Sequence, residues 1–183
     1  MKKPKPHYCD FAPAHPVHAL YHEKEYGFPT KSDRVLFERL CLEIMQAGLS
    51  WETVMRKRRA FNLAFDKFDP AKVALYGAKD RKRLLADSSI VRNRLKIDSI
   101  VYNARQIVDM KQTHGSFVKW IAAHHPLDKA GWVKLFKKQF KFMGGEIVGE
   151  FLMGTGYLPG AHHERCKIYG KIRKLRPPYI SSV

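Results

Sequence analysis

A single acidic residue, Glu43, lies within the otherwise apolar stretch LCLEIMQAGLSW, residues 40–51. Leu36, Leu40, Glu43 and Ala47 are spaced i, i+4, i+7 and i+11, which at ~100° per residue places them on one stripe of a helix. That stripe is expected to face the core, where a carboxylate must pair, protonate or line a cavity. Two interpretations are open: a structural ion pair with one of the many Arg and Lys side chains, or a functional acid.

Aromatic residues are frequent in the sequence around this helix. They are Tyr8, Phe11, Tyr21, Tyr26, Phe28 and Trp51. Such a group often does no more than fill a core. Beside a buried acid, however, aromatic faces could stack on a flat ligand and attract its positive charge, while the carboxylate accepts its N–H groups. The pattern therefore suits either a core or a pocket for a flat, cationic or hydrogen-bonding ligand.

Cysteine and histidine residues near both ends of the chain could together bind a metal ion. Cys9 and His22 are separated by 12 residues, and His162 and Cys166 by three. Two thiolates and two imidazoles suit a closed tetrahedral zinc site, which would fasten the two ends to each other. With nine histidines in the chain, ordinary surface residues explain the spacing equally well. Rival ligands are His7, His15, His18 and His163. Cys41 is expected to be a core thiol.

The stretch LLADSSIVRNRLKIDSIVYNAR, residues 84–105, has the pattern of a short helix, a tight turn and a long helix. The turn ends in Arg92, Asn93 and Arg94, at the expected N-terminus of the long helix. Backbone N–H groups there can hold a phosphate, and the arginines add positive charge. The alternative interpretation is a solvated basic surface with no ligand.

The charge of the chain favours a polyanionic partner. Its 183 residues include 34 Lys and Arg against 17 Asp and Glu, a net charge of +17. Such an excess favours nucleic acid first and an anionic membrane surface second. No apolar stretch approaches the ~20 residues of a membrane span, and no apolar segment follows the basic N-terminus as in a secretory signal. Three cysteines argue against a disulfide framework. We therefore expect a cytoplasmic or nucleoid-associated protein of one domain, or one domain in two lobes.

The elements that would position these residues are all expected to be helices. Helical periodicity is strongest over residues 33–48, with Thr30 or Ser32 as the N-cap. Further helices are expected at 51–65, from 70 onward, and at 79–86, 92–112, 116–123, 130–139 and 146–154. Residues 10–30 and those after 160 are expected to be irregular. No alternating run is long enough for a sheet core, so the predicted fold class is all-α.

These pieces, in this order, resemble the bacterial 3-methyladenine DNA glycosylase I family, a branch of the helix-hairpin-helix glycosylases. The most specific match is LFERLCLEIMQAGLSWETVMRKR, and further matches are YHEKEYGFP, FDKFDPAKVA, IVRNRLKIDSIVYNAR and FKFMGGEI. The resemblance spans nearly the whole chain. It implies one glycosylase unit over residues 1–183, with a helical body at 31–154 and a hairpin near 84–105. Segments 1–30 and 155–183 would form a second small lobe joined by one structural zinc ion (Zn²⁺).

The activity implied by the resemblance is that of a monofunctional enzyme of base excision repair, acting as a monomer on alkylated double-stranded DNA. Such an enzyme flips N3-alkylated adenine (3-methyladenine) out of the duplex, hydrolyses the N-glycosidic bond and leaves an abasic site. The family's pocket lacks the catalytic Asp of other helix-hairpin-helix glycosylases, so no strong general base is assigned. Selective binding of the electron-poor base could then supply much of the catalysis.

The resemblance also assigns roles to individual residues. Glu43 would be the catalytic-site acid that reads the base on the pocket floor, with Tyr21 and Trp51 stacking on the base. The hairpin residues that would grip the DNA backbone are Ile90, Val91, Arg92, Asn93, Arg94 and Lys96. The zinc ligands would be Cys9, His22, His162 and Cys166.

The chain departs from the family's pattern in its pocket and its hairpin. Phe11 and Tyr26 stand where the family usually has Trp, and His18 stands where it has a pocket Tyr. These residues would still line the substrate pocket, but with altered polarity. Positions at which the family favours glycine are occupied by Ser89, Leu95 and Gln139. Two alternatives are therefore a glycosylase of the same fold with shifted lesion specificity, and a non-catalytic protein that binds damaged DNA.

Overall fold

The computed structural model describes residues 6–180, and every regular element within that range is a helix. This confirms the predicted all-α class. The described chain divides into two compact units, a terminal unit made of residues 6–29 and 152–180 and a central unit made of residues 30–151. None of the helices described between residues 6 and 180 is long and apolar enough to cross a membrane.

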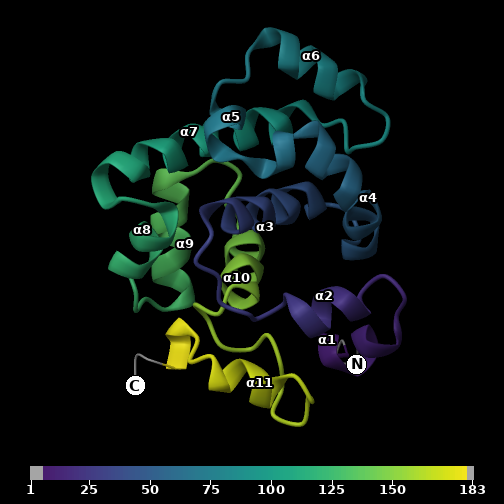
Figure 1. Ribbon diagram of the computed structural model, residues 1–183, viewed down its shortest axis with the longest axis vertical. Coiled ribbons are helices and arrows are strands. Elements are labelled where there is room, and N and C mark those ends of the chain that lie inside the picture. The colour runs from purple at the N-terminus through teal and green to yellow at the C-terminus, as the bar shows by residue number, and fades with distance from the viewer. Residues whose placement is uncertain (1–5, 181–183) are drawn as a thin grey trace. The chain divides into compact units, whose positions relative to one another are not determined.

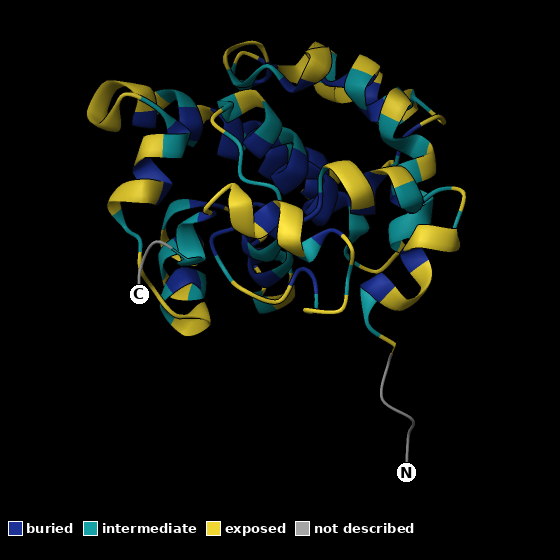
Figure 2. Cartoon of the chain, turned by 60° about the horizontal axis from the view of Figure 1, so that its bottom comes forward, coloured by how far each residue is buried: buried dark blue, intermediate teal, exposed yellow. Residues whose placement is uncertain are grey.

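The central unit is built on two helices, α3 (Asp33–Gln46) and α7 (Arg94–His114), which pack against each other (Figure 1). The remaining elements are α4 (Trp51–Ala64), the 3-10 turn η2 (Asp66–Phe68), α5 (Pro70–Ala74), α6 (Ala78–Ala86), α8 (Phe117–Ala123), α9 (Lys129–Gln139) and α10 (Gly145–Gly154). Helix α7 also contacts α5, α6 and α8. Buried residues lie along one face of these helices and exposed residues along the other (Figure 2), as amphipathic periodicity predicts.

Helix α3 has the boundaries and the buried face that its sequence predicts. The Ser32 hydroxyl accepts a hydrogen bond from the Val35 amide at 3.4 Å and so acts as the N-cap. The helix ends at Gln46, and Gly48 follows with a φ of +80°, a left-handed conformation that glycine adopts without steric cost. Glu43 lies on the buried face with 6% of its surface exposed.

Two long-range contacts attach α3 to its neighbours. The Asp33 carboxylate accepts hydrogen bonds from the Phe117 and Val118 amides at 3.1 and 2.9 Å, at the first turn of α8. The Arg58 guanidinium of α4 donates to the Glu38 carboxylate at 2.8 Å. Because the first amides of a helix have no partner within it, the contact from Asp33 satisfies two groups of α8 that would otherwise need water.

The sequence FDKFDP forms the break between helices that was predicted, by way of a left-handed turn. Asp66, Lys67 and Phe68 have φ values of 49°, 55° and 54°, a conformation that costs roughly 1–2 kcal/mol per residue for side chains with a Cβ. The ring of Phe65, just before the turn, and the ring of Phe68, within it, are both buried. They stack with their centroids 5.8 Å apart. Core packing therefore holds the turn.

The terminal unit brings together short helices from the two ends of the chain: α1 (Tyr8–Phe11), η1 (Ala12–Ala14), α2 (Ala19–Lys24), α11 (Tyr169–Lys174) and η3 (Pro178–Ile180) (Figure 1). Residues 10–30 and those after 160 are therefore not irregular as the sequence predicted. Helices of four to six residues are too short to show a hydrophobic period or to be stable alone. Local capping helps at α1, where His7 and Asp10 form a capping box.

Candidate functional site

Glu43 is a buried acid without a cationic partner. Burial raises the pKa of its carboxyl well above the ordinary value, and the Glu150 carboxylate on α10 raises the same pKa further. No Lys or Arg between residues 6 and 180 acts on this pKa. The structural ion pair that the sequence left open is therefore not formed in the described chain, and the neutral carboxyl is favoured in the ligand-free protein.

Trp51 begins the helix that follows α3, and the sequence between them fixes where it starts. The Ser50 hydroxyl accepts a hydrogen bond from the Thr53 amide at 3.1 Å, which makes Ser50 the N-cap of α4. The Trp51 side chain is partly buried. A short link of Ala47 to Ser50 thus connects the helix that carries Glu43 to the helix that begins with Trp51.

The other predicted pocket residues form one aromatic cluster in the terminal unit. The Tyr8 ring lies at its centre, with its centroid 5.4 Å from that of Phe11, 5.6 Å from that of His18 and 5.2 Å from that of Tyr26. The Tyr21 and Tyr26 centroids are 5.7 Å apart. His18, Tyr21 and Tyr26 are buried, whereas Phe11 is 42% exposed. Tyr8 is one of the aromatic residues near the Glu43 helix in sequence but was not assigned to base binding, although its position beside a candidate metal ligand was a usable signal.

The predicted base-binding residues are thus divided between the two units. Glu43 and Trp51 belong to the central unit, and the Tyr8 cluster belongs to the terminal unit. Their assembly into a single pocket stays a prediction.

The predicted phosphate-binding hairpin consists of α6, a turn and α7. The Asn93 side chain accepts a hydrogen bond from the Lys96 amide at 3.1 Å and caps α7. Arg92 and Arg94 are exposed beside this N-terminus, and Ile90 is buried beneath the turn. Positive side chains and the positive end of a helix dipole therefore coincide at one exposed place, which can attract a phosphate.

The turn itself is held by side chains and does not need the glycines that the family favours. The Asp87 carboxylate accepts hydrogen bonds from the amide and the hydroxyl of Ser89 at 2.9 and 2.5 Å. Neither Ser89 nor Leu95 has a positive φ. The Lys57 ammonium on α4 donates to the Ser89 carbonyl at 2.9 Å, a contact that the sequence did not indicate. Gln139, at the third such position, donates to the Gln106 side chain at 2.9 Å.

Lys96 is oriented differently from the other hairpin residues. It is only 5% exposed, and its ammonium donates hydrogen bonds to the carbonyls of Met45 at 2.9 Å and Ala47 at 2.5 Å. These carbonyls lie at the C-terminal end of α3. The Lys96 charge is therefore engaged inside the central unit, whereas Arg92 and Arg94 face solvent.

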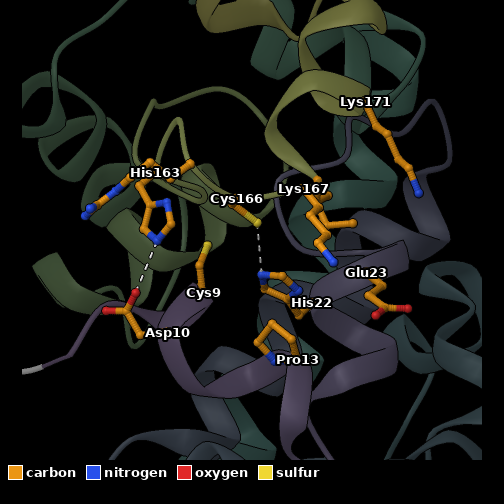
Figure 3. Close-up of a pocket in the computed structure, with 11 residues that line it drawn as sticks. Cys9, Asp10, Pro13, His22, Glu23, His163, Cys166, Lys167 and Lys171 are labelled. Atoms are coloured by element: carbon orange, nitrogen blue, oxygen red, sulfur yellow. Dashed lines mark hydrogen bonds and ion pairs between the residues drawn. The ribbon is translucent and has the colours of Figure 1, made fainter.

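Four residues from the two ends of the chain form a group that could hold a metal ion: Cys9, His22, His162 and Cys166. Figure 3 shows three of them, Cys9, His22 and Cys166. His162 Nδ1 lies 3.3 Å from the sulfur atoms of both Cys9 and Cys166, and His22 Nε2 lies 3.6 Å from the Cys166 sulfur. Sulfur and nitrogen ligands of a tetrahedral zinc ion would be about 3.5 Å apart. The donor set and its spacing therefore fit zinc.

The surroundings of the two histidines also fit metal binding. His162 Nε2 lies 2.8 Å from the Tyr26 carbonyl, which fixes the ring so that Nδ1 faces the sulfurs. Burial lowers the pKa of His162 to about 4, which keeps the ring neutral, as a ligand must be. His163 Nε2 lies 3.2 Å from the Asp10 carboxylate, and His163 belongs to a second candidate metal group with His7 and Cys9. Burial raises the pKa of the Cys9 thiol to about 12, so a bound cation would be needed to keep a thiolate there.

Comparison with known proteins decides the family. The family model for methyladenine glycosylases matches residues 11–134, a range that includes Glu43, Trp51 and the hairpin. The chain belongs to the methyladenine glycosylase family. The match begins after Cys9 and ends before His162 and Cys166, so only His22 of the four candidate metal ligands lies inside it.

Curated relatives and solved structures of methyladenine glycosylases agree with this assignment. DNA-3-methyladenine glycosylase 1 of Escherichia coli (strain K12) is 35% identical over 184 residues, covering 88% of this chain and 96% of the relative. DNA-3-methyladenine glycosylase of Haemophilus influenzae is 38% identical over 167 residues, covering 81% and 90%. A crystal structure of a 3-methyladenine DNA glycosylase I matches with a TM-score of 0.78 and 34% identity over 87% of this chain and 97% of the other.

A further solved structure concerns recognition of the base. It is described as the structural basis of 3-methyladenine recognition by the glycosylase of Staphylococcus aureus. Its TM-score is 0.78, with 32% identity over 87% of this chain and 95% of that chain. This chain therefore has the same fold as glycosylase structures that were determined to explain recognition of 3-methyladenine.

Proposed function

We propose that this protein is a DNA-repair glycosylase that removes 3-methyladenine from alkylated DNA by hydrolysis of the N-glycosidic bond, leaving an abasic site. Family membership and the names of the relatives support the reaction. The observation that carries the proposal is Glu43, a carboxyl that is buried without a cationic partner in the stretch that the family model matches. Such a group is costly unless a ligand uses it.

The reaction requires little proton transfer by the protein. Alkylation at N3 gives adenine a positive charge, which weakens the bond between N9 and the sugar carbon C1′. Water adds to C1′ and releases a proton to solvent, while the electron pair of the broken bond neutralises the base as it leaves. We therefore assign no general base. Preferential binding of the flipped cationic base supplies the catalysis.

Glu43 distinguishes the alkylated base from normal adenine. Burial favours its neutral form in the free protein, and a cationic ring beside it favours the carboxylate. Base binding therefore releases a proton from Glu43, and the carboxylate accepts N–H groups of the base edge. Trp51 is the candidate stacking residue of the central unit. The candidate aromatic residues of the terminal unit are Tyr21, Tyr26, His18 and Phe11.

The hairpin holds the DNA backbone of the duplex beside the flipped nucleotide. Arg92 and Arg94 are exposed at the N-terminus of α7, where they supplement the helix dipole. Asn93 shapes this N-terminus as its cap, and Ile90 anchors the turn in the core. The net charge of +17 adds a general attraction to DNA. We expect one chain to act alone.

We further infer that Cys9, His22, His162 and Cys166 hold one structural zinc ion. The donor types, their separations and the contact between His162 and the Tyr26 carbonyl support this. Zinc in a closed four-ligand site supplies cross-linking and no reactive position. It would join the segment that carries Tyr21 and Tyr26 to the C-terminal segment.

The test of the function is the release of bases from methylated duplex DNA, with the products separated and quantified. Release of 3-methyladenine well above the spontaneous rate is expected. Release of a different alkylated base in preference would favour a shifted lesion specificity. Tight binding to an abasic-site duplex with no release of any base would favour a damage-binding protein.

A further inference from the structure

Lys96 sits in the first turn of the DNA-binding helix, yet its side chain is directed into the central unit. Its backbone amide is held by the Asn93 cap at 3.1 Å, within the turn that presents Arg92 and Arg94 to solvent. Its ammonium donates to the carbonyls of Met45 and Ala47. One residue thus belongs by its backbone to the hairpin and by its side chain to α3.

The Lys96 ammonium forms its hydrogen bonds at the C-terminal end of α3, the helix that carries Glu43. Met45 lies two residues after Glu43, and Ala47 is the C-cap of α3. The last carbonyls of a helix have no partner within it and carry the negative end of the helix dipole. A buried ammonium is costly unless it is paired, and these carbonyls satisfy it. The contact therefore fixes the last turn of α3 and the start of the link to Trp51.

Direct contact with a DNA phosphate does not account for this geometry. A phosphate-binding lysine keeps its ammonium at the surface, whereas Lys96 is 5% exposed and its ammonium donates to backbone carbonyls at the end of α3. Arg92 and Arg94, which are exposed, suit the phosphate role. The two kinds of residue should therefore respond differently to substitution.

We propose that Lys96 is a positioning residue that couples the DNA-binding hairpin to the base-reading helix, holding Glu43 in register with a flipped base through the end of α3. The coupling rests on the proposed glycosylase function. A displacement of the hairpin on backbone binding is transmitted to α3 by the contacts of the Lys96 ammonium. Loss of those contacts leaves DNA affinity intact and slows excision.

The test compares Lys96→Met, which keeps the apolar stem and removes the donor, with Arg92→Met and with Lys111→Met, an exposed position on the same helix. Three quantities are measured for each: the single-turnover excision rate at saturating enzyme, the affinity for undamaged duplex, and the dependence of that affinity on salt. Lys96→Met is expected to lower the excision rate at least about 10-fold, with an unchanged salt slope and a DNA affinity within about 2-fold of wild type. A general loss of folded protein would lower the excision rate and the DNA affinity together.

The comparison variants are expected to behave oppositely. Arg92→Met should reduce the magnitude of the salt slope by about 0.9, the effect of one phosphate contact, and should weaken binding to undamaged duplex. Lys111→Met should match wild type in rate. Lys96→Arg keeps a charged donor and should recover part of the lost rate; it also serves if Lys96→Met does not fold.

Two results would overturn the coupling. One is a folded Lys96→Met with the wild-type excision rate. The other is a Lys96→Met whose salt slope falls by about 0.9 along with its DNA affinity, which would make Lys96 a phosphate contact. In either case wild type still releases the base, so the proposed function stands. A wild-type protein that releases no base would instead refute the function and the coupling together.

Discussion

The protonation of Glu43 links the stability of this protein to its chemistry. A carboxyl whose pKa is raised in the folded state is stabilising, relative to an ionised one, only while it holds its proton. Its contribution is fully present below the unfolded-state pKa and is lost as the pH rises through the folded-state pKa. The protein thus retains an acid whose ionisation destabilises its core, as expected for a group kept to bind a ligand.

We expect Glu43→Gln to be more stable than wild type at high pH, because glutamine keeps the shape of the side chain and cannot ionise. The difference in the free energy of unfolding should be smallest near pH 4 and should grow as the pH rises, because only the wild-type side chain pays for ionisation in the core. Denaturant unfolding of both proteins from pH 4 to pH 9 measures it. A difference that is independent of pH would contradict a raised pKa at Glu43.

Helix α3 is the element that fixes the position of Glu43, and contacts with segments distant in sequence hold both of its ends. Asp33 at its first residue binds the first turn of α8, and Lys96 binds its last carbonyls. The Glu38 contact with Arg58 joins its middle to α4. A helix held in this way has little freedom to tilt, which suits a group that must meet a base in a defined geometry.

Replacing Asp33 with Ala should destabilise the protein by about 1–2 kcal/mol, because two amides of α8 lose their partner. Thermal or denaturant unfolding gives the value. Asp109→Ala, an exposed position on α7, is the control and should lie within about 0.5 kcal/mol of wild type. Equal effects of the two substitutions would show that the Asp33 contacts contribute nothing of their own.

Long helices with a clear hydrophobic period could be predicted from the sequence. Fourteen residues of α3 show the helical period over almost four turns, and so its class, its Ser32 cap and the burial of Glu43 could all be predicted. The acceptors of Lys96 lie 49 and 51 residues away in the sequence. No local pattern distinguishes such a lysine from one that binds phosphate.

In the molecule as a whole, the two ends of the chain meet in one unit. The cysteine and histidine residues near each end suggested this meeting from the sequence alone. Two thiols and two imidazoles suit zinc, so residue type suggested this set, although nine histidines left ordinary surface residues as an equal alternative. The choice between His162 and His163 needed the structure, since it depends on which ring nitrogen faces the sulfurs. The short helices α1, α2 and α11 were missed because their stability comes from packing in this unit and not from their own sequence.

His162→Ala should abolish binding of the zinc ion, whereas His163→Ala should retain one ion per chain. Elemental analysis of the freshly purified variants measures this. Amide hydrogen exchange should then rise in residues 6–29 and 152–180 of His162→Ala while α3 and α7 stay protected, because a small unit depends on its cross-link more than a larger core does. Full metal content in His162→Ala would contradict the proposed ligand set.

Release of 3-methyladenine by this protein is proposed to depend on recognition of the base by the Glu43 carboxylate. The most direct measurement is the single-turnover release of 3-methyladenine from methylated duplex DNA by wild type, Glu43→Gln and Glu146→Gln, the last an exposed acid on α10. We predict release by wild type and by Glu146→Gln at equal rates, and a loss of about 10- to 100-fold for Glu43→Gln, as expected for a hydrogen bond to a charged group. Release by Glu43→Gln at the wild-type rate, or no release by wild type above the spontaneous rate, would contradict the account.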